Sequence, residues 1–334
     1  MTRVAINGFG RIGRTVLRQL LTTRKDTGLQ VALINDIATI DLCAYLFAHD
    51  SVFGVYPEKV QTDGDHLIIG ETRIAFTNDP DLSQTDLSDI DIVLECAGHA
   101  KTREIAERGL NAGASQVLIS GPTDAADVTV VMGANDDALG DARIVSNASC
   151  TTNALAPLAK LLDDTYGLTA AHMTTIHCYT SSQPMIDAPR GDFARSRAGA
   201  MSMVPTTTSA TQRVLEVLPH LSDRLTGAAV RVPTASVSAV DLTATLNAAV
   251  TVDQLNELMA SADPNLIGTT DLPLVSTDLR SRPESLIVAT PETIATTPHQ
   301  VRIFGWYDNE WGFANRMLEM ALRMGTGASA TVPG

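Results

Sequence analysis

Cys150 is the residue of this sequence best placed for covalent chemistry. It stands between an extended run, Ala142–Asn147, and a pattern of leucines at helical spacing over residues 155–162. A cysteine at the start of a helix faces free backbone N–H groups, which favour thiolate over thiol. Its neighbours Ser149 and Thr151 add donors suited to an anion. A buried structural cysteine is the alternative, but small polar neighbours suit a core poorly, so the pattern predicts a nucleophile.

His177 is the candidate base for that nucleophile. It lies near the end of an expected strand, Met173–Tyr179, just before a polar segment without clear periodicity. A histidine at the end of a strand can meet a cysteine from another part of the chain. Such a pair deprotonates the sulfur and lets the imidazolium donate to a developing oxyanion. For this residue taken alone, a structural histidine satisfied by its neighbours is the alternative.

A second candidate site is the glycine-rich run Gly8-Phe9-Gly10-Arg11-Ile12-Gly13, which follows a strand and opens a helix. Glycines at this spacing permit a tight turn, close approach of the backbone to pyrophosphate, and close packing of strand and helix. Asp36 ends the next strand, where a carboxylate binds ribose hydroxyls and repels a 2′-phosphate. The combination predicts a dinucleotide site that favours NAD over NADP. A helix N-cap is the alternative role for Asp36.

Composition limits the remaining function classes. The 334 residues are 44% hydrophobic and 19% charged, which is typical of a folded protein with room for two domains. A net charge of −14 argues against nucleic acid as the main partner. No apolar run reaches membrane-spanning length, and a strand begins at the N-terminus, so the expected location is the cytoplasm. Four dispersed cysteines form neither a disulfide framework nor a metal motif, and no metal is expected.

The elements that must position these residues change character at Cys150. Before it, β-rich runs alternate with helical patterns at Arg11–Thr22, Leu42–Phe47 and Thr102–Leu110. This alternation predicts an α/β fold with a Rossmann-type, doubly wound parallel sheet.

After Cys150, longer strand patterns such as 226–232 and 301–307 predict an α+β domain with a mostly antiparallel or mixed sheet. The irregular segment at about 180–204 is long for a compact enzyme, which indicates a functional loop. The last helix, Trp311–Met324, is amphipathic and should pack back on the first domain. We therefore expect a dinucleotide-binding domain of residues 1–149 and 314–334, with a catalytic domain, 150–313, inserted between them.

Five motifs follow one another along the chain: Ala5–Arg14, Ser146–Asn153, Arg231-Val232-Pro233-Thr234, Val240-Asp241-Leu242 and Trp306–Glu310. In this order they resemble the phosphorylating, NAD-dependent glyceraldehyde-3-phosphate dehydrogenase family over nearly the whole chain.

The resemblance implies a role for each matching residue. Cys150 would be the nucleophile and His177 the base. Substrate and inorganic phosphate would be held by Ser149, Thr151, Thr180, Arg197, Thr208, Ser209 and Arg231. NAD would be held by Asn7, Gly8, Phe9, Gly10, Arg11, Ile12, Gly13, Asp36, Ser120 and Asn309. The segment at 180–204 would be the family's S-shaped loop, which contacts the cofactor across a subunit interface of a homotetramer.

The same resemblance implies the reaction: oxidation of glyceraldehyde 3-phosphate to 1,3-bisphosphoglycerate in glycolysis or gluconeogenesis, through a thiohemiacetal and a thioester on Cys150. The sequence departs from the family where Ser209 replaces a usual glycine and Ser182 a usual aspartate, which bears on phosphate affinity. Erythrose-4-phosphate dehydrogenase is the nearest rival, although Asp36 and Thr180 favour the glyceraldehyde type. A catalytically silent NAD-binding scaffold or regulator is the alternative of another class.

Overall fold

The computed structural model describes residues 1–326, which form two compact units. Unit 1 comprises residues 1–130, 136–148 and the C-terminal segment from Ala314, and unit 2 comprises residues 131–135 and 149–313. Of the predicted C-terminal segment 314–334, the part beyond Thr326 lies outside the described residues.

Unit 1 is built on a nine-stranded sheet of order β10-β11-β9-β8-β1-β2-β7-β6-β5. All neighbours from β10 to β7 are parallel, and β7, β6 and β5 form an antiparallel edge. The strands are β1 (Thr2–Asn7), β2 (Leu29–Asn35), β5 (Val60–Asp63), β6 (His66–Ile69), β7 (Thr72–Thr77), β8 (Ile92–Glu95), β9 (Gln116–Ile119), β10 (Val128–Thr129) and β11 (Ile144–Ser146). A separate ribbon pairs β3 (His49–Asp50) with β4 (Gly54–Val55).

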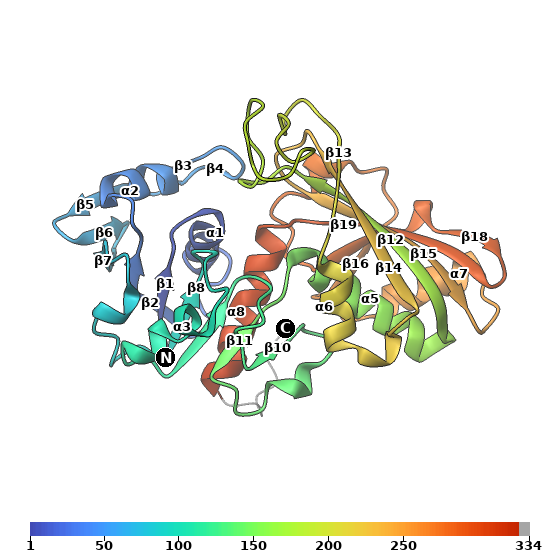
Figure 1. Cartoon of the computed structure of the whole chain (residues 1–334), viewed down its shortest axis with the longest axis horizontal. Coiled ribbons are helices and arrows are strands. Elements are labelled where there is room, and N and C mark those ends of the chain that lie inside the picture. The colour runs from blue at the N-terminus through green and yellow to red at the C-terminus, as the bar shows by residue number, and fades with distance from the viewer. Residues whose placement is uncertain (327–334) are drawn as a thin grey trace. The chain divides into compact units, whose positions relative to one another are not determined.

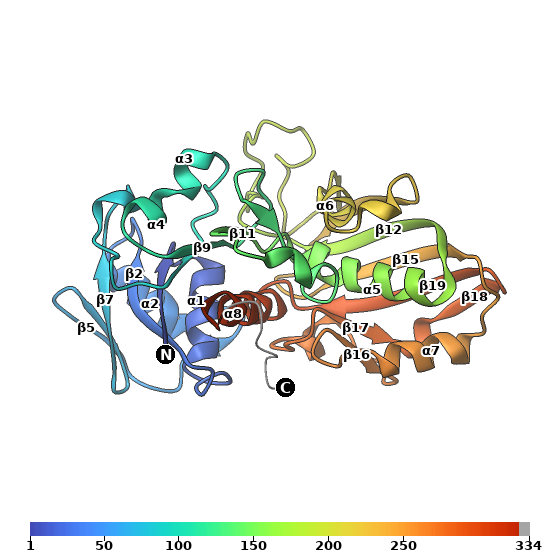
Figure 2. The ribbon, with the colours of Figure 1, turned by 90° about the horizontal axis from the view of Figure 1, so that it is seen from below.

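The helices of unit 1 cover both faces of this sheet, so its central strands are buried throughout, as β8 illustrates. They are α1 (Arg11–Leu20), α2 (Ile40–Ala48), α3 (Arg103–Ala106), α4 (Arg108–Asn111) and most of α8 (Trp311–Thr326). Figure 2 shows α1 and α8 side by side, with α3 and α4 across the sheet from them. The predicted doubly wound α/β arrangement is confirmed.

One helix prediction for unit 1 was wrong in detail. The stretch Thr102–Leu110 is not one helix but the two short helices α3 and α4. Gly109 lies so close to the sheet that a Cβ there would come within 2.9 Å of Val93 and 3.0 Å of Val117. Close packing at this point thus needs a glycine, which lies inside α4, whereas the break itself falls at Glu107.

Unit 2 is built on an eight-stranded mixed sheet of order β13-β14-β12-β15-β19-β17-β16, with β18 paired to β19 (Figure 1). The pairs β12/β14 and β16/β17 are parallel and the others antiparallel, which confirms the predicted mixed sheet. The strands are β12 (Leu168–Cys178), β13 (Val204–Thr206), β14 (Leu225–Val232), β15 (Ser238–Leu246), β16 (Ile267–Thr270), β17 (Leu286–Ala289), β18 (Ile294–Thr297) and β19 (Gln300–Tyr307). The helices are α5 (Cys150–Tyr166), α6 (Ala210–Val217) and α7 (Val252–Ser261).

The C-terminal helix α8 is anchored in unit 1 by a buried ionic cluster. The Glu319 carboxylate accepts hydrogen bonds from Arg316 at 2.7 Å, Arg24 at 2.9 Å and Asn315 at 3.0 Å. Arg24 also donates to the Asn315 amide oxygen at 2.8 Å. Arg316 is fully buried, and Glu319 supplies a carboxylate partner for its charge.

We therefore expect Glu319→Ala to lower the free energy of unfolding by about 3–5 kcal/mol, because it removes the carboxylate that accepts from Arg316, Arg24 and Asn315 together. The shift of the urea unfolding midpoint measures this effect. Asp164→Ala is the matched control, since it removes the carboxylate of an exposed pair with Lys160 and should change stability by less than about 0.5 kcal/mol. Equal effects of the two substitutions would contradict the proposed anchor.

No helix among residues 1–326 is long and apolar enough to cross a membrane. Within the same residues, no three His, Cys, Asp or Glu side chains gather as a metal site.

Candidate active site

Cys150 is the first residue of α5, a helix of 17 residues. The helix begins here because Ser149 caps it: its hydroxyl accepts a hydrogen bond from the Thr152 N–H at 3.1 Å. The chain enters the helix through Ala148, whose φ of 54° lies in the left-handed region that non-glycine residues rarely adopt. The turn thus delivers the Cys150 sulfur to the start of a long helix.

The structure brings His177 to this sulfur. Its Nε2 lies 3.5 Å from the Cys150 Sγ, although the two residues are 27 positions apart. His177 is nearly the last residue of β12, an inner strand between β14 and β15, and only 6% of its surface is exposed. Its ring meets the ring of Tyr307 edge-on at 6.0 Å between centroids. The imidazole is therefore fixed by packing, as a positioned base requires.

Arg231 completes the group because of strand register. In the parallel pair β12/β14, Arg231 lies directly opposite His177. Its Nη1 donates to the Cys178 carbonyl oxygen at 3.0 Å and contacts the Nδ1 of His177. The same Nδ1 lies 2.8 Å from the Cys178 carbonyl oxygen. A guanidinium only donates and a carbonyl only accepts, so this setting accommodates either neutral tautomer of His177.

The surroundings favour the neutral form of both reactive groups. Burial and the positive charge of Arg231 lower the pKa of His177 to about 4. Burial raises the pKa of the Cys150 thiol, although part of this residue is exposed. The charge of Arg231 and the N–H groups at the start of α5 act in the opposite direction and lower that pKa. The sequence had suggested a thiolate; the structure instead pairs a thiol with an unprotonated base.

Arg231 should therefore control the pH dependence of Cys150. Its charge lowers the pKa values of both Cys150 and His177, so Arg231→Gln should raise both, and less thiolate should form at a given pH. We expect the pH profile of Cys150 alkylation by iodoacetamide to move to higher pH in this variant. Arg231→Lys keeps the charge and is the matched control, whose profile should stay near that of the parent. A profile unchanged by Arg231→Gln would contradict the electrostatic role.

A buried hydroxyl chain lies beneath the pair. The Tyr307 hydroxyl is 2.8 Å from the Thr151 hydroxyl and 2.8 Å from the Thr175 hydroxyl. The contact with Tyr307 therefore fixes the Thr151 hydroxyl, and only 5% of the surface of Thr151 is exposed. Ser149 is partly exposed and its hydroxyl contacts Thr152 Oγ1 at 2.7 Å.

The predicted phosphate residue Arg197 is not brought to the other residues of its set. Its Nε bonds the Asp187 carboxylate at 2.8 Å, within the loop and on its exposed surface. The arginine that reaches the threonine run is Arg195, which donates to the Thr206 hydroxyl at 2.6 Å and to the Thr207 hydroxyl at 2.9 Å. Sequence reasoning missed Arg195 because two arginines, two residues apart in a loop without periodicity, cannot be told apart by pattern.

The remaining predicted phosphate residues are placed as follows. Thr180 is partly exposed just after β12, and its hydroxyl lies 2.9 Å from that of Ser182. Thr208 accepts the Ala210 N–H at 3.1 Å where α6 begins. Ser209 is exposed at the N-cap of α6 and makes no side-chain capping bond, so its hydroxyl remains available.

The glycine run of unit 1 forms a cradle. A Cβ at Gly8 would lie 2.4 Å from the Ala97 backbone, and one at Gly13 would lie 2.2 Å from the Gly8 carbonyl. At Gly10, by contrast, a Cβ would meet nothing within 4 Å, so space opens above the turn. No side chain caps α1 there, which leaves its first N–H groups directed at that space. These features fit a pyrophosphate.

Asp36 lies beside the cradle. Its carboxylate accepts the N–H of Phe9 at 2.6 Å and that of Ala38 at 2.8 Å, one at each oxygen. Each oxygen keeps a further lone pair for a ribose hydroxyl. The structure thus gives Asp36 a role in the turn in addition to the predicted one.

The other residues predicted to bind the cofactor lie around the same turn, and several of their side chains are engaged with protein groups. The Asn7 side chain donates to Glu95 at 2.5 Å and accepts from Asn35 at 2.8 Å, so it supports the end of β1 beside the turn. The Arg11 side chain pairs with Asp50 at 2.5 Å. Ser120 follows β9, Ile12 lies in the first turn of α1, and the Phe9 ring stacks on Phe47 at 6.0 Å.

Asn309 belongs to unit 2, two residues before α8 begins, and 8% of its surface is exposed. Its Oδ1 lies 3.2 Å from the Cys178 sulfur and 3.5 Å from the Ser238 hydroxyl.

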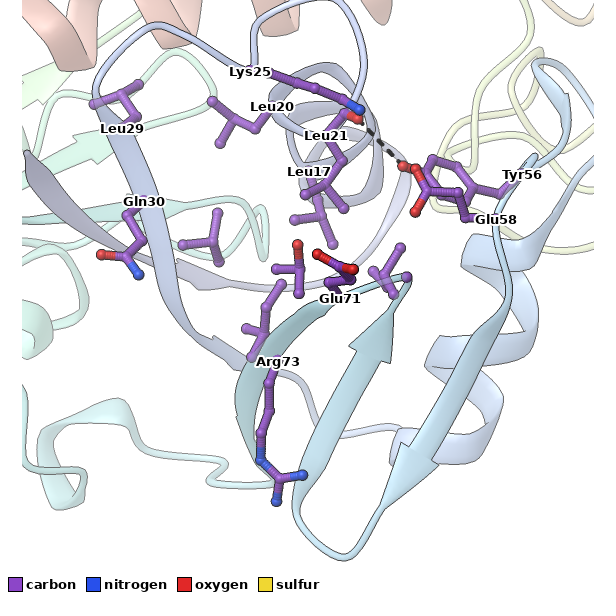
Figure 3. A pocket seen from close by; sticks show the side chains of 15 residues that line it. Leu17, Leu20, Leu21, Lys25, Leu29, Gln30, Tyr56, Glu58, Glu71 and Arg73 are labelled. Atoms are coloured by element: carbon purple, nitrogen blue, oxygen red, sulfur yellow. Dashed lines mark hydrogen bonds between the residues drawn. The ribbon is translucent and has the colours of Figure 1, made fainter.

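A further cavity, of about 570 Å³, opens in unit 1 between α1, β2 and the β6–β7 turn (Figure 3). Its walls include Leu17, Leu20 and Ile74, with Lys25 and Glu71 among its polar residues (Figure 3). None of the residues that carry the predicted chemistry lines it. We therefore do not assign it to the active site.

Unit 1 combines a parallel sheet, a glycine cradle and a carboxylate beside it, and unit 2 pairs a cysteine with a histidine and an arginine. This combination is typical of an NAD-dependent oxidoreductase. Residues 2–103 match the family "Glyceraldehyde 3-phosphate dehydrogenase, NAD binding domain", and residues 149–309 match its C-terminal domain. The chain belongs to the glyceraldehyde-3-phosphate dehydrogenase family.

Comparison with individual proteins supports the same family. The chain is 44% identical to glyceraldehyde-3-phosphate dehydrogenase of Xanthobacter flavus, with 97% of this chain and 98% of the relative covered. It is 45% identical to the enzyme of that name from Pseudomonas aeruginosa, with 96% of this chain and 98% of that relative covered. It is 43% identical to the enzyme of that name from Cereibacter sphaeroides, with 97% of this chain and 98% of that relative covered.

Proposed function

We propose that this chain catalyses the NAD-dependent, phosphorylating oxidation of glyceraldehyde 3-phosphate to 1,3-bisphosphoglycerate. The observation that carries the proposal is the 3.5 Å contact between Cys150 Sγ and His177 Nε2 at the start of α5, with Arg231 beside it. A thiol next to an unprotonated base can attack an aldehyde.

The mechanism follows from these atoms. His177 Nε2 takes the thiol proton as the Cys150 sulfur forms a bond to the aldehyde carbon, and returns it to the aldehyde oxygen. Before that proton is returned, the His177 Nε2–H and the Cys150 N–H stabilise the developing oxyanion, and the product is a neutral thiohemiacetal. The Gly8–Gly13 turn and Asp36 would hold NAD, which would supply the acceptor for the hydride of this adduct. His177 removes the hydroxyl proton at the same time, which leaves a thioester on Cys150. Inorganic phosphate then attacks the thioester carbon, and the sulfur leaves as an acyl phosphate forms.

The anionic groups of substrate and product need local cations, because the chain carries a net charge of −14. Arg231 is the cation nearest the reacting pair, and its planar fork suits a phosphate. Thr180 would share the substrate phosphate with it. Ser149, Thr151, Thr208 and Ser209 would supply hydroxyls to the attacking phosphate, and the contacts of Arg195 support this residue, rather than Arg197, as their cation.

Unit 1 would bind NAD at the Gly8–Gly13 turn with Asp36 on the adenosine ribose, and unit 2 would perform the chemistry. Asn309 would hold the nicotinamide carboxamide. The cradle and the two free lone pairs of Asp36 support this division.

A homotetramer in the cytoplasm is the further expectation. The loop at 180–204 exposes apolar side chains that a monomer would leave in water, and such patches mark interfaces. Phe193 is 100% exposed, and Met185, Ile186, Met201 and Met203 are more than 70% exposed. Light scattering of the purified chain tests this, and a monomeric mass would refute it.

The reaction is tested by measuring NADH formation from glyceraldehyde 3-phosphate and from erythrose 4-phosphate, each with and without inorganic phosphate. We expect turnover that needs phosphate and a higher kcat/KM for glyceraldehyde 3-phosphate. A preference for erythrose 4-phosphate would change the substrate but keep the mechanism. No turnover with either aldehyde, despite NAD binding, would support the scaffold alternative.

A further inference from the structure

Asn309 is held at its amide oxygen by two side chains from neighbouring strands. Cys178 ends β12 and Ser238 begins β15, which is paired with β12 (Figure 1). The Cys178 S–H donates to Asn309 Oδ1 at 3.2 Å, and the Ser238 O–H donates to the same atom at 3.5 Å. Two donors at one atom determine which end of the amide faces the strands.

Cys178 is suited to be a permanent donor. It is fully buried, and burial raises the pKa of its thiol to about 12, so the proton stays on the sulfur at neutral pH. His177 Nδ1 is more distant from this sulfur, at 3.8 Å. The Cys178 carbonyl accepts from Arg231, so this residue joins the catalytic group to Asn309.

Ser238 has its hydrogen available for Asn309 because its oxygen accepts the Cys178 N–H at 3.2 Å. The residue before it, Val237, has a φ of 66°, which is a strained conformation for a β-branched side chain. Such strain persists only where the surrounding contacts enforce it. The position of Ser238 is therefore determined by the fold.

The backbone next to Asn309 is also fixed by hydrogen bonds. The buried Asp308 carboxylate accepts the N–H groups of Ser281 at 2.8 Å, Glu310 at 3.0 Å and Trp311 at 2.9 Å. With backbone and Oδ1 both held, Nδ2 is the free end of the amide, and it donates to no protein atom within residues 1–326.

We propose that Cys178, together with Ser238, is a positioning residue that locks the Asn309 amide so that Nδ2–H is its only group presented to the cofactor. The inference rests on the proposed contact between Asn309 and the nicotinamide carboxamide. Asn309 then donates a hydrogen bond to the carbonyl oxygen of the carboxamide and makes no hydrogen bond with its NH2 group. The 3-acetylpyridine analogue of NAD keeps that carbonyl but has a methyl group in place of NH2, so this protein should bind it nearly as well as NAD.

Removal of the Cys178 donor should make the protein discriminate between NAD and the 3-acetylpyridine analogue. In Cys178→Ala the Asn309 amide can turn and present Oδ1, which accepts from the NH2 of NAD but finds no donor on the analogue. We expect the ratio of the two Kd values, analogue over NAD, to rise roughly threefold to tenfold, the range of one neutral hydrogen bond. Cys178→Ser keeps a donor and should restore the ratio.

The experiment is calorimetric titration of the full chain and its variants with NAD and with the analogue, without substrate. Asn309→Ala separates the two proposals: if it weakens neither ligand, the placement of Asn309 at the carboxamide is wrong. If it weakens both while Cys178→Ala leaves the ratio unchanged, only the lock is wrong. Ser238→Ala should raise the ratio in the same direction, so the test remains decisive if Cys178→Ala does not fold.

Discussion

Cys150→Ala should abolish turnover, with kcat at least about 10⁴-fold lower, while the affinity for NAD stays near that of the parent. Loss of an enzyme's nucleophile removes the covalent route, and the penalty in comparable enzymes is of this order or greater. NAD affinity should survive because the residues proposed to hold the pyrophosphate and ribose all lie in unit 1, and Cys150 lies in unit 2. Steady-state kinetics and calorimetric titration with NAD measure the two quantities.

Cys43→Ala is the matched control for this substitution. Cys43 is buried, and burial raises the pKa of its thiol to about 11, which makes it an inert sulfur. Its replacement should leave most of kcat intact. If Cys150→Ala retained a substantial part of the parent kcat, the assignment of the nucleophile would be wrong.

His177→Asn should lower kcat by about 10²–10⁴-fold, the usual contribution of a positioned general base. The variant has no group to take the thiol proton, and the pKa of Cys150 is already raised by burial, so the thiol should stay protonated. We therefore expect slower alkylation of Cys150 by iodoacetamide at neutral pH as a second readout. The pKa of His177, about 4, leaves the base free of its proton above that value, so parent activity should be lost only as the pH falls toward it.

His172 supplies the control for His177. It is an exposed residue of the same strand, bonded to Thr226 at 2.9 Å and not to Cys150. His172→Asn should leave kcat and the alkylation rate nearly unchanged. An equal loss in both histidine variants would indicate damage to β12 rather than loss of a base.

The fold was predictable where local pattern decides structure. Glycines at 8, 10 and 13 between a strand and a helix are a local signal, and α1 begins at Arg11 as the pattern implies. The N-terminal end of α5 was also predictable, because Ser149 is a good cap and leucines follow at helical spacing. The break between α3 and α4 was not, since it falls at Glu107, where the sequence has no glycine or proline to mark it.

The site was predictable in its residue types but not in its electrostatics or its supporting contacts. The rule that a helix N-terminus lowers a thiol pKa held for the N–H groups, but burial acts more strongly in the opposite direction. The choice between Arg195 and Arg197 depends on Asp187, which captures Arg197 within the loop. The contact between Cys178 and Asn309 joins residues 131 positions apart, and no local signal could indicate it.

The central claim is that the aldehyde is oxidised while it is covalently attached to Cys150. Its most direct test mixes the full chain with NAD and glyceraldehyde 3-phosphate in the absence of inorganic phosphate, followed by mass spectrometry of the quenched protein. We expect one equivalent of NADH per chain and a single 3-phosphoglyceroyl group, bound as a thioester, on the peptide that contains Cys150, released when phosphate is added. NADH formation without any adduct, or with an adduct on another residue, would contradict this account.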